Sequence, residues 1–77
     1  MIVRLLLWNL SNSKTTLEEV RARLEPDPNR TWISNENTER FGVIETWESE
    51  PEEFPVEIRD LIGKDPEIAE EFEVEAV

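Results

Sequence analysis

The segment between residues 35 and 49 constrains the fold of this chain most strongly. It reads Asn-Glu-Asn-Thr-Glu-Arg-Phe-Gly-Val-Ile-Glu-Thr-Trp-Glu-Ser. A polar turn leads into an apolar, β-branched run that is typical of a strand, and a serine suited to the start of a helix follows it. This order predicts a pair of neighbouring strands in the middle of the chain, with a helix after them.

Two segments have the spacing of amphipathic helices. Leu17, Val20 and Leu24 fall at i, i+3 and i+7, which places them on one side of a helix. The second helix is predicted for residues 55–62, because a proline suits the first helical turn and Gly63 suits the position after the last one. One helix therefore precedes the central pair of strands and one follows it.

Strands are also predicted at both ends of the chain. Residues 2–10 are apolar at odd and even positions alike, as in a strand buried on both faces. Residues 30–34 and 41–48 form the central pair, and residues 68–77 alternate apolar side chains with glutamates. The whole chain, residues 1–77, is therefore expected to form one α+β domain with the element order β-α-β-β-α-β.

The short connections favour a ferredoxin-like fold. Its four antiparallel strands lie in the order 4-1-3-2, counted along the chain, and both helices cover one face of the sheet. Truncating Leu5 or Phe72 to alanine is then expected to cost about 2–5 kcal/mol. The predicted core consists of apolar residues on the covered side of the sheet and on the helices: Phe72, Val74, Leu5, Leu7, Ile44, Leu17, Val20, Leu24, Ile58 and Leu61.

The other face of the sheet is expected to stay open. In the last strand, the alternation assigns the apolar residues, Ala76 among them, to the helices and the glutamates to the open side. The open face is then expected to mix apolar, aromatic and charged side chains: Ile2, Arg4, Leu6, Trp8, Phe41, Val43, Glu45, Trp47, Glu71, Glu73 and Glu75. Exposed apolar surface of this extent usually marks an interaction site, and two-fold dimers are the commonest assemblies. We therefore expect a homodimer whose interface contains Leu6, Trp8, Val43 and Trp47.

One cluster on this face is a candidate ligand site. Arg4, Trp8, Glu45 and Trp47 combine a charge pair with two large aromatic walls, as a pocket for a small aromatic molecule requires. A buried carboxylate at Glu45 would also suit a general base. The alternative is that Arg4 and Glu45 form an ion pair and that the tryptophans pack in the core or in the dimer interface.

The charge of the chain limits its partners. The net charge is −11, with residues 1–35 at +1 and residues 36–77 at −12. An acidic surface repels phosphate backbones and anionic lipid headgroups, which argues against nucleic-acid and membrane binding. The charge is expected to keep the chain well solvated, and a basic protein partner is the alternative. The sequence shows neither a signal peptide nor a membrane span, so a cytoplasmic protein is expected.

The residue types limit the chemistry. The chain has no histidine, cysteine or tyrosine and only two glycines. Zinc, copper and haem sites use histidine or cysteine, a serine nucleophile uses a histidine base, and phosphate-binding loops need more glycines. Three glutamates along one strand do not converge on a cation. No metal site and no cofactor are therefore predicted.

The second half of the chain resembles a known family. Residues 35–77 contain the pattern Asn35-x-x-Thr38-x-x-Phe41-Gly42-x-Ile44-x-x-Trp47-x-Ser49, followed by Gly63-x-x-Pro66-x-Ile68-x-x-x-Phe72-x-Val74. This pattern is similar to that of the dimeric α/β-barrel proteins of the YdhR-like mono-oxygenase type. The resemblance implies a ferredoxin-like protomer, a dimer whose sheets face each other, and a small-molecule cavity between sheet and helices.

The resemblance and the chemistry lead to different expectations of function. The family pattern implies a cofactor-independent mono-oxygenase-like enzyme acting on a small aromatic substrate. This chain, however, carries Glu45 where the family usually has an aromatic residue, and it lacks histidine and tyrosine. We therefore expect a non-enzymatic or degenerate member that acts in binding, with an acidic protein-interaction or regulatory module as a further alternative.

Overall fold

Four antiparallel strands and two short helices follow one another in the order β-α-β-β-α-β. The computed structural model describes residues 1–75. Its elements are β1 (Ile2–Asn9), α1 (Leu17–Arg21), β2 (Arg30–Asn35), β3 (Arg40–Trp47), α2 (Val56–Ile62) and β4 (Ile68–Glu73). The strand order is β2-β3-β1-β4, which from the other edge of the sheet reads 4-1-3-2. Strand β1, which is apolar at odd and even positions alike, therefore lies inside the sheet.

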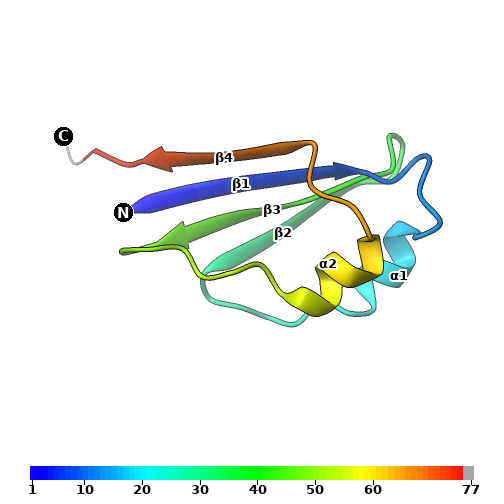
Figure 1. Cartoon of the computed structure of the whole chain (residues 1–77), viewed down its shortest axis with the longest axis horizontal. Helices are drawn as coiled ribbons and strands as arrows, with labels where there is room; N and C mark the ends of the chain where they lie inside the picture. The colour runs from blue at the N-terminus through cyan, green and yellow to red at the C-terminus, as the bar shows by residue number, and fades with distance from the viewer. Residues whose placement is uncertain (76–77) are drawn as a thin grey trace.

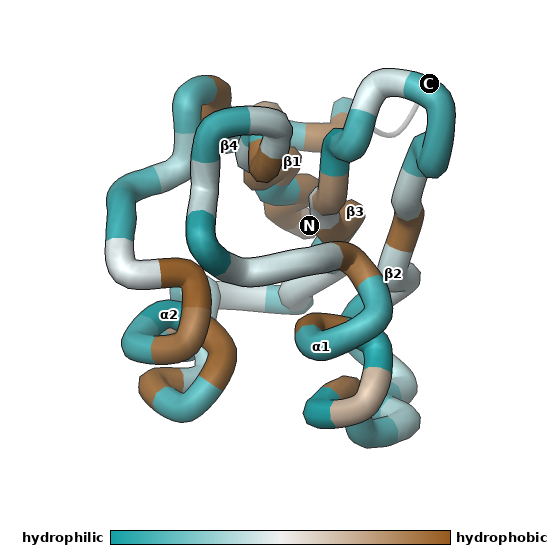
Figure 2. The backbone as a smooth tube through the Cα atoms, turned by 90° about the vertical axis from the view of Figure 1, so that its right-hand side faces the viewer, coloured by the Kyte–Doolittle hydropathy of each residue, from teal (hydrophilic) through white to brown (hydrophobic). Residues whose placement is uncertain are grey.

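Both helices lie on one side of the sheet, under the end where β1 finishes (Figure 1). Figure 2 shows them side by side below the strands, with hydrophobic and hydrophilic residues alternating along each. The other end of the same side has no helix, and residues 48–55, which join β3 to α2, run beneath it (Figure 1). We call residues 48–55 the strap. One face of the sheet is thus covered by the helices and the strap, and we call it the covered face.

Each of the two short helices has a capping residue at one end. Thr16 caps α1, with its hydroxyl accepting a hydrogen bond from the amide of Glu19 at 3.2 Å. Helix α1 ends at Arg21, three residues before the predicted stripe ends at Leu24. Gly63 closes α2 in the left-handed conformation, at φ 75°, which a glycine adopts without steric cost.

The hydrophobic core lies between the helices and the covered face. Val20 and Ile58, both predicted for the core, are buried in it, and Leu17, Leu24 and Leu61 pack against it. The rest of the cluster comes from the sheet, the strap, a loop and the end of α2: Leu6, Trp8, Leu10, Phe41, Val43, Phe54 and Ile62.

The predicted assignment of the sheet residues to the two faces is wrong. Leu6, Trp8, Val43 and Trp47, expected on the open face and in the dimer interface, are all buried on the covered face. The strand residues expected in the core lie on the other face: Leu5, Leu7, Ile44 and Phe72. Val74, also expected in the core, follows β4 and is exposed. Because successive side chains of a strand alternate, one wrong choice inverted the predicted faces of β1, β3 and β4.

The inversion came from β4. Its alternation predicts that Phe72 faces the helices, but β4 is an edge strand whose six residues are all exposed. Phe72 lies opposite Val3 on the open face, whereas Glu71 and Glu73 lie opposite Arg4 and Ile2, on the same side as the helices. The strand ends at Glu73, and the predicted place of Ala76 lies outside the described residues.

The helices are also too short for a membrane. Within residues 1–75, no helix has the length and apolar character that crossing a bilayer requires.

Candidate functional site

A buried carboxylate lies at the centre of the covered face. Glu45 on β3 is fully buried, and the strand pairing places it beside Arg4 of β1 and Arg30 of β2. Arg4 Nε donates to Glu45 Oε1, and Arg30 Nε donates to Glu45 Oε2 at 2.6 Å. Arg30 also binds Asp27 at 2.7 Å. We call Arg4, Asp27, Arg30 and Glu45 the charge cluster.

The charge cluster holds the strap against the sheet. Arg4 Nη2 donates to the carbonyl of Glu52 at 2.6 Å, and Arg30 Nη2 donates to the carbonyl of Glu53 at 3.1 Å. The covered face is therefore apolar beneath the helices and ionic beneath the strap. The backbone carbonyls of the strap accept hydrogen bonds here in place of water.

Trp47 also lies in this region, beside Arg30. The guanidinium of Arg30 lies over its ring, 5.1 Å from the centroid, in cation–π geometry. The indole Nε1 of Trp47 is buried, and among residues 1–75 it has no hydrogen-bond partner. The ring therefore acts as an apolar wall that shields one side of Arg30.

This arrangement leaves Glu45 without the freedom that a general base needs. Both of its oxygens accept hydrogen bonds from guanidinium groups, and its side chain has no exposed surface. A base must reach the proton that it removes. The predicted pairing of Arg4 with Glu45 is confirmed, and it is a structural ion pair inside the domain.

Trp8, predicted to share a site with Trp47, lies at the opposite end of the sheet. It is paired with Phe41, whereas Trp47 is paired with Ile2 at the other end of β1. Its ring stacks on Phe41 with centroids 5.8 Å apart and contacts Phe54 at 5.0 Å. The four predicted ligand residues therefore do not line one pocket.

Two members of the charge cluster were missed in the sequence. Arg30 and Asp27 lie in and just before the short strand that pairs with β3. The signal was available, because aligning the central hairpin about its turn places Arg30 directly opposite Glu45. Opposite charges facing each other across two strands stabilise the pair.

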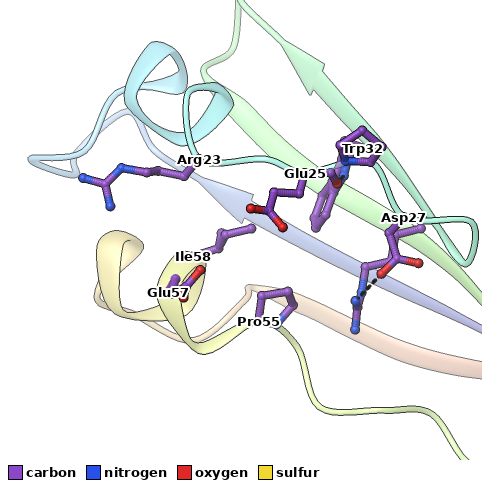
Figure 3. Close-up of a pocket in the computed structure, with 9 residues that line it drawn as sticks. Arg23, Glu25, Asp27, Trp32, Pro55, Glu57 and Ile58 are labelled. Carbon is purple, nitrogen blue, oxygen red and sulfur yellow. Dashed lines mark hydrogen bonds and ion pairs between the residues drawn. The ribbon is translucent and has the colours of Figure 1, made fainter.

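A cleft of about 160 Å³ opens beside the charge cluster (Figure 3). It lies between the loop after α1, strand β2 and the start of α2. Its lining mixes apolar and charged side chains: Arg23, Glu25, Pro26, Asp27, Arg30, Trp32, Pro55, Glu57 and Ile58. This volume is below the roughly 300 Å³ that is usual for a small-molecule site.

The larger hollows lie on the surface. One of about 560 Å³ lies between Leu10, helix α1 and the turn at residues 36–39, and most of the side chains around it are polar. Among residues 1–75, no three acidic side chains converge closely enough to hold a metal ion.

The opposite face of the sheet is open and strongly apolar. We call it the open face, and the alternation of the strands assigns to it these apolar residues: Val3, Leu5, Leu7, Ile33, Ile44, Ile68 and Phe72. Phe72 is 49% exposed and Ile68 is 45% exposed, values that are high for large apolar side chains. Among residues 1–75, both helices lie on the other side of the sheet (Figure 1).

On the open face, a glycine of β3 lets a side chain of β1 pack closely against the backbone. Gly42 lies on β3 opposite Leu7, and the Leu7 side chain leans across the space that a Cβ would occupy. A Cβ at this position would also come within 2.6 Å of the carbonyl oxygen of Leu6. A shallow groove of about 190 Å³ remains here, lined mainly by apolar atoms of Leu7, Ile33 and their neighbours.

No protein-family model matches the sequence, and no curated protein matches it either. The open face, the charge cluster and the filled core are therefore the features that bear on function.

Proposed function

We propose that this chain is a non-catalytic interaction domain that acts as a homodimer, in the manner of the dimeric α/β-barrel proteins that it resembles. The observation that carries the proposal is the open face. Seven apolar side chains of four neighbouring strands form one continuous surface, and contiguous apolar surface of this kind usually marks a contact site in a soluble domain.

The charge distribution favours a second copy as the occupant. The chain carries a net charge of −11, which makes two copies repel each other over most of their surfaces. The strand residues of the open face include one acid, Glu70, and one base, Arg40. Two copies therefore meet through this face with less repulsion than through the acidic remainder of the chain.

The size of the face predicts a modest affinity. Four strands spaced by about 4.8 Å, with about six residues each, give a surface of about 400 Å² per copy. Stable dimers usually bury about 800 Å² per partner, so this face belongs to the lower end of the range. The dimer is then concentration-dependent, with the monomer present in dilute solution.

The filled interior supports binding through the surface over catalysis. Trp8, Phe41 and Phe54 pack against one another under the sheet, and both oxygens of Glu45 are occupied by arginines. A mono-oxygenase-like activity on an aromatic molecule would need an apolar cavity beside a reactive group. Titration with a panel of small aromatic molecules should leave the tryptophan fluorescence unchanged, and a saturable change would contradict the proposal.

The test of the dimer is sedimentation with a matched pair of variants. Phe72 on the open face is 49% exposed, and Val56 on α2, away from that face, is 48% exposed. Phe72→Lys should abolish the dimer, because it introduces a charge into the apolar contact, whereas Val56→Lys should leave it intact. Wild-type protein that sediments at 9.1 kDa up to about 500 μM would contradict the proposal.

A further inference from the structure

Within residues 1–75, one edge of the sheet has no element beside it. Strand β4 is the last in the strand order, and all six of its residues are exposed. In Figure 1 it lies along the border of the sheet, and no described element lies beyond it. An edge strand directs alternate backbone N–H and C=O groups outward, where they can pair with another strand.

The opposite edge differs. Strand β2 is bordered by the loop after α1, where Trp32 Nε1 donates to the carbonyl of Glu25 at 3.2 Å. Arg21 of α1 donates to the hydroxyl of Ser34 at 2.7 Å. Trp32 and Ser34 lie on the covered side of β2, so these contacts bring a loop and an arginine against that side of the strand. Within residues 1–75, β4 has hydrogen bonds to β1 alone.

The side chains of β4 favour a partner strand of positive charge. Glu71 and Glu73 point to one side of the sheet and Glu70 to the other, and in residues 1–75 none of the three forms an ion pair. Glutamates on an edge strand repel a second copy of the same strand, which blocks pairing of two β4 edges. The same glutamates attract a strand that carries lysine or arginine at alternate positions.

We propose that the outer edge of β4 accepts an extended segment of a basic partner protein, in which lysine or arginine alternates with apolar residues. The partner's backbone would pair with the outward groups of β4. Its basic side chains would lie beside Glu71 and Glu73, and its apolar side chains would extend the open face beside Ile68 and Phe72. The site lies at the edge of the sheet, adjoins the open face at Ile68 and Phe72, and does not require the dimer to form.

Three peptides test the proposal against ¹⁵N-labelled full-length chain. The probe is acetyl-Lys-Val-Lys-Val-Lys-Val-amide. The second peptide replaces every lysine with glutamate, which reverses the charge. The third replaces every valine with proline, which keeps the charge but removes backbone donors. The probe should shift the amide resonances of residues 68–73 and slow their hydrogen exchange, and it should bind at least about tenfold more tightly than the other two peptides.

A double variant tests the role of the glutamates. Glu71→Lys with Glu73→Lys should weaken probe binding about tenfold or more and favour the glutamate peptide. Glu48→Lys with Glu50→Lys makes the same change in net charge on the exposed strap region and should leave probe binding nearly unchanged. All four positions are exposed, and circular dichroism verifies that each variant is folded.

Three results would overturn the proposal. Equal binding of the lysine–proline peptide would show attraction by charge without strand pairing. Amide shifts centred on β2 or on the helices would place the partner elsewhere. Absence of probe binding up to millimolar concentration would exclude the edge as a site. Sedimentation in the same buffer reports the dimer separately, so failure of one proposal is distinguishable from failure of the other.

Discussion

At the scale of single residues, Glu45 is the most constrained side chain of this domain. It is a fully buried carboxylate between two arginines, and each arginine also binds a carbonyl of the strap. Burying a charge is costly unless it is paired and hydrogen-bonded. The cluster is therefore a stabilising contact only while it is complete, because losing one member leaves the others buried without partners.

Replacing Glu45 by glutamine tests this reading. Glu45→Gln should lower the free energy of unfolding by about 3–5 kcal/mol, since Arg4 and Arg30 then lose the charge that compensates theirs. Urea unfolding followed by tryptophan fluorescence measures the loss.

Glu48→Gln is the matched control, because Glu48 is exposed near the end of the same strand and forms no ion pair within residues 1–75. Its effect should be within about 0.5 kcal/mol. Equal effects of the two substitutions would mean that the charge cluster does not hold the strap in solution.

At the scale of elements, most of the secondary structure was predictable. The helical spacing, the central turn and the two-sided apolar strand gave the order of elements, and the predicted strand at residues 2–10 corresponds to β1 at Ile2–Asn9. The alternation of the strands was predictable as well. What the pattern did not give was which side of each strand faces the helices.

The reason is that β1 is apolar on both sides. Leu6 and Trp8 are on one side of it and Leu5 and Leu7 are on the other, so its sequence does not distinguish the covered face from the open face. The large aromatic residues of β3 carried the missing information. Phe41 shares a side of β3 with Val43 and Trp47. The opposite side holds the smaller set Gly42, Ile44 and Thr46. The bulkier side of a central strand is the better guide to the core than the alternation of an edge strand.

Large-to-small substitutions on the two faces should lower the free energy of unfolding by different amounts. Ile58→Ala, in the core at 3% exposure, should cost about 2–5 kcal/mol. Phe72→Ala should cost about 1 kcal/mol or less in the monomer, because half of its side chain is already in water. Chemical unfolding in dilute solution, where sedimentation finds the monomer, measures both. A cost for Phe72→Ala as large as that for Ile58→Ala would place Phe72 in the core after all.

At the scale of the whole molecule, two surfaces have no partner within residues 1–75. The open face is apolar and nearly neutral, and the β4 edge is acidic with free backbone groups. The candidate site predicted from the sequence was wrong in its place but partly right in its contacts, because the Arg4–Glu45 pair exists on the covered face. The pairing was predictable from adjacent strands, whereas its burial depended on the strap, whose path no periodic pattern encodes.

The central claim is that two copies of this chain meet through the open face. Nuclear Overhauser effects in an equimolar mixture of ¹³C-labelled and unlabelled chain, filtered for contacts between copies, test it most directly. The account predicts intermolecular contacts at the methyl groups of Val3, Leu5 and Ile44, with none at Val20 or Ile58. Intermolecular contacts at the helices, or none at the open face at a concentration where the dimer sediments, would contradict it.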